Sequence, residues 1–137
     1  MIFIINTGHP TLSFTSCLLS IAQVSLDLYD QIMVNRSHLL SFKTWHSNGE
    51  VKQLFECSNG HQLKELSQKL DLTVADNQIC MALITDPQQQ EPVCLALFGI
   101  SSDLEQYISQ FKRLQMCPSR FFISNDDSSN TDSSMKQ

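Results

Sequence analysis

The stretch ITDPQQQEPVCLALFG, residues 84–99, connects two apolar runs through a short polar segment. The first run is ICMALI (79–84) and the second is VCLALFG (93–99). The segment from Asp86 to Pro92 is too short for a helical crossover, so the two runs are antiparallel neighbours if they pair. Both runs are apolar throughout, which is typical of strands that are covered on both faces. This stretch therefore predicts two neighbouring strands of a sheet that is covered on both faces.

Two more strands and two helices are predicted before this stretch. The apolar segments MIFII (1–5) and VKQLFEC (51–57) indicate strands. Between them, apolar residues at helical spacing predict a long helix over 16–34 and a shorter helix over 37–46. The long helix is expected to bury Leu18, Ile21, Ala22, Leu28, Tyr29 and Ile32. The shorter helix contains the only tryptophan, Trp45, which we interpret as a core anchor.

Two further helices are indicated by polar pairs that could form capping boxes. Asn59 and Gln62 precede the apolar stripe Leu63, Leu66 and Leu70, and Ser102 and Glu105 open the last helix. The last helix is expected to bury Leu104, Tyr107, Ile108, Phe111 and Leu114. Its basic residues at 112–113 would then lie in its final turn, where cations complement the helix dipole.

The predicted order is strand, helix, helix, strand, helix, strand, strand, helix. This order indicates an α/β fold with a four-stranded mixed sheet and helices on both faces. The chain has 137 residues, enough for one domain with one core, and we assign residues 1–117 to it. Residues 118–137 are rich in Ser, Asn and Asp, so we predict a disordered polar tail there.

Charge and composition restrict the classes of partner. Nine Lys and Arg against fourteen Asp and Glu give a net charge of −5, so any RNA-binding surface must be a local basic patch. The five cysteines form no Cys-x-x-Cys pair and the four histidines show no ligand spacing, so we predict neither a metal site nor a cofactor. No signal peptide or membrane span is recognised, and the predicted location is the cytoplasm.

Several strings resemble one enzyme family when they are taken in this order. They are MIFIIN, IAQVSLDLYDQI, HQLKELSQKL, ICMALITDP and PVCLALFGISSDLEQYISQFKRLQ. Together they resemble the type 2 peptidyl-tRNA hydrolases, and most closely the divergent branch of peptidyl-tRNA hydrolase domain-containing proteins. The resemblance covers about 115 residues and is strongest from Val51 to Gln115. It implies hydrolysis of the ester between a peptide or aminoacyl group and tRNA.

The resemblance also implies candidate site residues. Gln23, in the Ala-Gln pair typical of the family, and Asp86, at the place of the family aspartate, are the candidate catalytic residues. The lysine and histidine of typical members are missing, since Leu18 and Leu19 stand near the lysine position and Leu26 near the histidine position. The implied partner is tRNA, and basic residues are required to contact its phosphates.

Other interpretations of the same residues are open. Asp86 before Pro87 also suits the first residue of a turn, and Gln23 could be a surface glutamine. Lys43 and Lys52, together with Lys64 and Lys69, could form a tRNA-facing patch or ordinary solvated faces; we take Lys43 and Lys52 as candidate substrate-binding residues. The alternative function is a catalytically inactive binding module for RNA or a protein partner. No membrane contact is expected, and a homodimer stays open.

Overall fold

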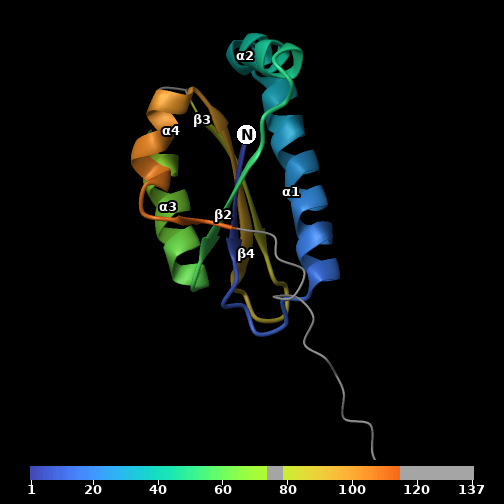
Figure 1. Ribbon diagram of the computed structural model, residues 1–137, viewed down its shortest axis with the longest axis vertical. Coiled ribbons are helices and arrows are strands. Elements are labelled where there is room, and N and C mark those ends of the chain that lie inside the picture. Colours follow the sequence, from blue (N-terminus) through green and yellow to red (C-terminus); the bar gives the residue numbers. More distant parts are fainter. Residues whose placement is uncertain (74–78, 115–137) are drawn as a thin grey trace, which may run out of the picture.

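The computed structural model describes residues 1–73 and 79–114. Its elements in chain order are β1 (Ile2–Asn6), α1 (Phe14–Val34), α2 (Arg36–Ser47), β2 (Gln53–Cys57), α3 (Gly60–Thr73), β3 (Ile79–Thr85), β4 (Pro92–Gly99), α4 (Ser101–Ile108) and β5 (Lys112–Arg113) (Figure 1). The predicted tail, residues 118–137, lies outside the described residues. The strands and helices predicted up to residue 99 are confirmed to within a few residues at their ends.

The strands form one mixed sheet in the order β3-β4-β1-β2-β5. β1 and β2 are parallel, with Ile4 opposite Phe55, and β1 is antiparallel to β4, with Ile4 opposite Leu95. β3 and β4 pair antiparallel along their length, with Ala82 opposite Ala96. The α/β class, the mixed sheet and the antiparallel pairing across residues 86–91 are therefore confirmed.

The prediction of four strands and a last helix through Leu114 was wrong. α4 ends at Ile108, and Lys112–Arg113 instead form an exposed edge strand antiparallel to β2. Phe111 packs on one face of the sheet and Leu114 on the other, although a helix would place residues three apart on the same side. The chain must therefore cross the edge of β2, where the Leu114 N–H donates to the Leu54 carbonyl over 3.0 Å.

The helix starts were predicted with mixed success. The Gln62 N–H donates to Oδ1 of Asn59 over 3.1 Å as predicted, but the Gln62 side chain accepts from the Ser58 N–H over 3.2 Å instead of returning to Asn59. α4 begins at Ser101, one residue before the predicted cap, and no side-chain cap is seen there among the described residues. The capping box of Ser102 and Glu105 was therefore wrong, because Ser102 already lies inside the helix.

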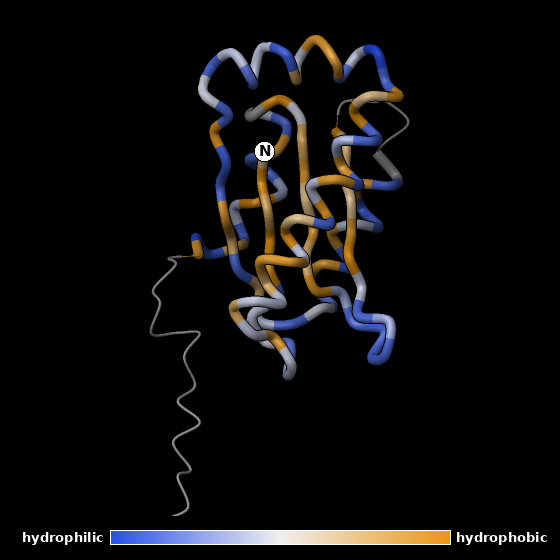
Figure 2. Tube along the Cα trace, turned by 90° about the vertical axis from the view of Figure 1, so that its right-hand side faces the viewer, coloured by the Kyte–Doolittle hydropathy of each residue, from blue (hydrophilic) through white to orange (hydrophobic). Residues whose placement is uncertain are grey.

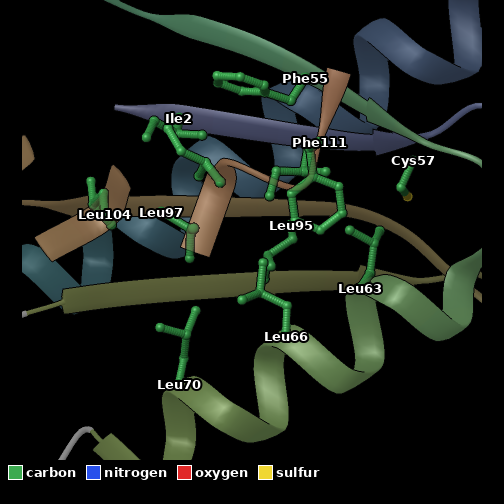
Figure 3. Packing of buried hydrophobic residues seen from close by; sticks show 12 residues of the cluster. Ile2, Phe55, Cys57, Leu63, Leu66, Leu70, Leu95, Leu97, Leu104 and Phe111 are labelled. Atoms are coloured by element: carbon green, nitrogen blue, oxygen red, sulfur yellow. The ribbon is translucent and has the colours of Figure 1, made fainter. Parts of the chain in front are cut away.

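Helices cover both faces of the sheet, as the apolar strands required. On one face, α3 packs Leu63, Leu66 and Leu70 against Leu95 and Leu97 of β4, and α4 adds Leu104 (Figure 3). On the opposite face, α1 packs Cys17, Val24, Leu28 and Ile32 against residues of β1, β3 and β4. α2 lies across the end of this layer (Figure 1), where Trp45 and Phe42 contact Phe98 at ring-centroid separations of 6.0 and 5.9 Å.

α1 also has properties of a membrane-crossing helix. Within the described residues, it is the one helix whose length and apolar composition would allow it to span a bilayer. One face of the same helix is nevertheless part of the core, where Val24, Leu28 and Ile32 are fully buried against the sheet. The expectation that the chain makes no membrane contact stays a prediction.

The loop after β1 is held against the loop after β2. The N–H and the hydroxyl of Thr7 both donate to the Cys57 carbonyl, over 3.0 and 3.1 Å. The next residue, Gly8, lies so close to this loop that an added Cβ would be 1.9 Å from the carbonyl oxygen of Ser58. Only glycine fits at this close approach of two backbones.

We therefore expect Gly8→Ala to lower the free energy of unfolding by about 2 kcal/mol or more, because a backbone must move to relieve the overlap. The matched variant Gly49→Ala has no atom within 4 Å of its added Cβ and a backbone φ of 93°. Its expected cost is about 1 kcal/mol. Urea denaturation of both variants measures the difference, and a smaller loss for Gly8→Ala than for Gly49→Ala would contradict the proposed close contact.

Candidate functional site

Polar loops gather at one end of the sheet. β1, β2 and β3 run in the same direction, so residues that follow these three strands lie at the same end as the start of β4 (Figure 1). In open α/β sheets, ligands bind beyond the carboxyl ends of strands. The connection of residues 86–91 and the loop of residues 7–13 both lie there, and Asp86 is in the first of them.

Asp86 is a turn residue and also faces a histidine. Its Oδ1 accepts from the N–H groups of Gln88 and Gln89, over 2.8 and 3.3 Å, as a turn-forming aspartate does. Its Oδ2 lies 3.2 Å from Nε2 of His9, in the loop after β1. The two carboxylate oxygens therefore serve different partners, and forming the turn does not exclude a chemical role.

The imidazole of His9 is buried and oriented. Its side chain is 3% exposed, against 18% for that of Asp86. Its Nδ1 accepts from the Thr11 N–H over 3.3 Å and lies 3.1 Å from the Thr11 hydroxyl. Because a backbone N–H can only donate, Nδ1 is an acceptor, and in the neutral ring the proton is on Nε2, the atom nearer to Asp86. In the described part of the chain, Nε2 has no well-aligned hydrogen-bond partner despite its proximity to Oδ2.

These groups line a cleft of about 330 Å³. The lining residues are His9, Thr11, Leu12, Ser16, Ser20, Ile84, Thr85, Asp86, Pro87, Gln88 and Val93. They come from the loop after β1, the first turns of α1, the end of β3 and the start of β4. The cleft thus combines a carboxylate, an imidazole and several hydroxyl groups on an apolar floor, within the volume range of small-molecule sites.

A larger cavity of about 550 Å³ lies at the opposite end of the sheet, between α2 and α4. Trp45, Phe98 and Leu104 are among its mostly apolar lining residues, and Glu105 is the one acidic side chain in this lining as far as the structure describes it. Because neither histidine nor cysteine lines it there, this cavity offers no acid–base pair. The smaller cleft is therefore the stronger candidate for chemistry.

Hydrogen bonds of the buried Asn6 side chain and of Glu91 hold together the loops next to the cleft. The fully buried Asn6 donates from Nδ2 to Oε1 of Glu91 over 3.2 Å and to the Pro92 carbonyl over 3.0 Å, and its Oδ1 accepts from the Gly8 N–H over 3.1 Å. The same Oε1 of Glu91 accepts from the Gly60 N–H, in the first turn of α3, over 3.3 Å. Three loops that are distant in sequence are thereby fixed relative to His9.

The charge on Asp86 is favoured by its neighbours. Hydrogen bonds from the backbone of Gln88, and to a lesser extent of Gln89, lower the pKa of the Asp86 carboxyl, and His9 contributes in the same direction. Asp86 is therefore a carboxylate at neutral pH. A carboxylate beside Nε2 stabilises an imidazolium, so the pair can orient His9 and support proton transfer at Nδ1.

The cysteine thiols, unlike the Asp86 carboxyl, are held in their neutral form. Burial raises the pKa of Cys57 and of Cys80 to about 11 and that of Cys94 to about 12, so these thiols are protonated at neutral pH. The Cys57 thiol faces the Asn59 carbonyl at 3.4 Å, whereas His61 pairs with Glu65. Within residues 1–73 and 79–114, no group of three or more His, Cys, Asp or Glu side chains is placed to hold a metal ion.

The other predicted site residues lie outside the cleft. Gln23 is exposed on α1, where its amide donates to Asp27 over 3.0 Å, and it does not line the cleft. α2, which contains Lys43, and the start of β2, which follows Lys52, lie at the opposite end of the sheet from the β3–β4 connection (Figure 1). Lys52 is 3.3 Å from a carboxylate oxygen of Glu50. The roles assigned to these three residues stay predictions.

His9 and Thr11 were not predicted as site residues. The sequence was searched for histidines at metal-ligand spacing, and His9 shows no such spacing. The available signal was topological: His9 and Asp86 follow two strands that run in the same direction, so both lie at the same end of the sheet. No motif in the sequence joins two residues so far apart.

Comparison with known proteins adds no identification. No protein-family model matches this chain, and no curated protein matches it. The resemblance to peptidyl-tRNA hydrolases therefore rests on the sequence strings given above.

The Asp86 carboxylate predicts a pH-dependent effect on stability. Its pKa is lower in the folded than in the unfolded chain, so its stabilising effect is present at neutral pH and is lost as the pH falls through the folded-state pKa. Asp86→Asn keeps the oxygen that the turn requires and removes the charge beside His9. We expect this variant to melt at a lower temperature than wild type at pH 7, with the difference shrinking as the pH falls through the lowered pKa of the Asp86 carboxyl in the folded chain.

The control for this comparison is Glu65→Gln, which removes the carboxylate of the exposed pair with His61 on α3. Exposed pairs contribute little, so its melting temperature should stay close to wild type at both pH values. A difference between wild type and Asp86→Asn that is equally large at neutral and acidic pH would refute the electrostatic explanation.

Proposed function

We propose that this chain hydrolyses the ester between a peptide or aminoacyl group and tRNA in the cleft that contains His9 and Asp86. The observation that carries the proposal is the buried His9 ring, which has the Thr11 hydroxyl at one nitrogen and the Asp86 carboxylate at the other. A hydroxyl, an imidazole and a carboxylate in series are the groups that acyl transfer requires. The resemblance to peptidyl-tRNA hydrolases supplies the substrate class.

In the proposed reaction, Nδ1 of His9 takes the hydroxyl proton of Thr11 while Thr11 Oγ1 attacks the ester carbonyl carbon. The ribose oxygen leaves with that proton, and the acyl group stays on Thr11. Water then attacks the acyl group, assisted by the same imidazole, and the acid and the Thr11 hydroxyl are released. Asp86 stabilises the imidazolium in each step. The first turns of α1 line the cleft through Ser16, so the positive end of the helix dipole favours charge developing on the carbonyl oxygen.

The chemistry needs no cofactor, because each proton transfer uses a side chain of the chain itself. The candidate phosphate ligands Lys43 and Lys52 lie at the opposite end of the sheet from the cleft. An acceptor stem with its 3′ end in the cleft would have to extend along the sheet to contact them. We place the activity in the cytoplasm.

That separation favours a second candidate function, a catalytically inactive module that binds RNA or a protein partner. The cleft lining includes neither Lys nor Arg among the described residues, so it offers no cation for a phosphate. In this alternative, His9 and Asp86 serve to hold the two loops together. The two functions predict different results for substitutions of His9 and Asp86: a hydrolase loses its rate of acyl release, whereas a binding module has no such rate to lose.

Release of the acyl group from N-acetyl-aminoacyl-tRNA by the purified chain tests the proposal. We expect His9→Gln and Asp86→Asn each to lower kcat/KM by at least about 100-fold, as loss of general acid–base catalysis does. The matched controls are His61→Gln and Glu65→Gln, which alter an exposed histidine–carboxylate pair on α3 and should retain wild-type rates. No release by wild type, with a genuine peptidyl-tRNA hydrolase active in the same assay, would reject the hydrolase and leave the binding module.

Variants of Thr11 test which group attacks the ester. Thr11→Val removes the hydroxyl at nearly the same volume and should lose activity to the same extent as His9→Gln, whereas Thr11→Ser should retain most of it. Rapid-quench measurement on the wild type should show a burst of released tRNA before steady state. Full activity in Thr11→Val would show that water, rather than Thr11, is the attacking group.

A further inference from the structure

The outer face of α1 carries a second apolar stripe. Leu19, Leu26, Tyr29 and Met33 are 65%, 62%, 44% and 36% exposed, and Ala22 between them is also exposed. The prediction that Ala22 and Tyr29 are buried was therefore wrong, although the Tyr29 ring contacts that of Phe42, on α2, at a centroid separation of 5.6 Å. They follow one another at intervals of three and four residues, the spacing of the a and d positions of a coiled coil. This seam lies on the opposite side of the helix from the residues that pack on the sheet. Figure 2 turns the side of the molecule that carries α1 towards the viewer.

The seam is a second apolar face on a helix whose first apolar face already packs against the sheet, so we expect the seam to bind a partner. A surface helix needs one apolar face, and α1 already buries Cys17, Val24, Leu28 and Ile32 against the sheet. Leu18, which is 45% exposed, lies at the margin of the seam. Large exposed apolar surfaces of this kind mark interaction sites.

The charges of α1 indicate what kind of partner fits. The helix contains neither Lys nor Arg, and its acidic residues are Asp27 and Asp30. Anionic lipid surfaces and nucleic acids are bound through basic residues beside the contact, which this helix lacks. The absence of basic residues on α1 therefore favours a protein helix of complementary shape as the partner.

We propose that the partner is a second copy of this chain, with the two α1 helices packed antiparallel about a two-fold axis at the helix centre, near Val24. Antiparallel coiled coils place a positions opposite d positions. This pairing puts Ala22 opposite Leu26 of the second copy and Leu19 opposite Tyr29 of the second copy. The small Ala22 thus meets a leucine, and the helices overlap along all 21 residues, about 31 Å.

Asp30, a charged residue beside the seam, is placed favourably by antiparallel packing. Antiparallel pairing brings Asp30 beside the N-terminal turns of the other α1, close to its Ser16. The first turn of α1 contains no acidic residue, so the positive end of its dipole has no carboxylate of its own chain on that turn. A parallel arrangement would instead place Asp30 beside the C-terminal turns of the other α1, at the negative end of its dipole. The helix dipoles therefore favour the antiparallel dimer.

Sedimentation equilibrium of the full chain tests the proposal without any activity measurement, so its outcome is independent of the proposed hydrolase. We expect a species of twice the 15.5 kDa chain mass at micromolar concentration. Leu19→Glu combined with Leu26→Glu should weaken association at least about 100-fold, since it buries carboxylates in the seam. The control Leu40→Glu changes a leucine of α2 that is 72% exposed and should leave the dimer intact.

The seam variants are expected to fold, because both leucines are exposed in the single chain, and a circular dichroism melt checks this. A chain that is monomeric at 100 µM overturns the proposal, as does a dimer unaffected by the two seam substitutions. Binding of the monomer to neutral lipid vesicles through the seam, abolished by the same substitutions, would assign the surface to a membrane and overturn the proposal as well.

Cysteine cross-linking tests the direction of pairing. Gln23→Cys lies next to the two-fold axis, so the antiparallel dimer should form a disulfide between the two introduced thiols on mild oxidation. Thr15→Cys lies near the end of the seam, far from its equivalent in an antiparallel pair and adjacent to it in a parallel pair. Cross-linking of Thr15→Cys without cross-linking of Gln23→Cys would overturn the antiparallel arrangement.

Discussion

Strand β4 is buried from Pro92 to Phe98, and the rest of the structure depends on covering it. Its backbone hydrogen bonds are taken by β3 on one side and β1 on the other. Its side chains alternate between the layer of α3 and α4 and the layer of α1, so each residue needs an apolar partner above or below the sheet. A strand with this composition cannot lie at an edge. Its central place determines where the loops on either side of it emerge.

The same constraint builds the candidate site. Because β4 starts at the end of the sheet where β1 and β3 finish, the turn at Asp86 and the loop that carries His9 meet there. Glycine at position 8 allows the loops after β1 and β2 to approach closely, and Glu91 links Asn6 to the first turn of α3. Close backbone packing and buried side-chain hydrogen bonds thus hold the loops that carry His9 and Asp86, which is the kind of support that catalytic groups need.

The strongly periodic segments of the sequence predicted most of the fold. The features that were not predicted were missed for physical reasons. The runs at 79–84 and 93–99 could be paired because their connection is short. The edge strand β5 was missed because two residues carry no periodicity, and Phe111 and Leu114 satisfy helical spacing equally well. Asp86 was found through the sequence resemblance. His9 was missed because its role depends on the tertiary contact with Asp86, and neither residue propensity nor local spacing predicts such a contact.

The position of β1 between β2 and β4 also has a consequence for synthesis on the ribosome. The first strand of the chain cannot be paired on both sides until the strand at residues 92–99 has left the exit tunnel. Until then β1 and the sheet-facing side of α1 lack their main partners, and non-local pairing of this kind is slow. The nascent chain therefore exposes these apolar segments before the strand that buries them has been synthesised.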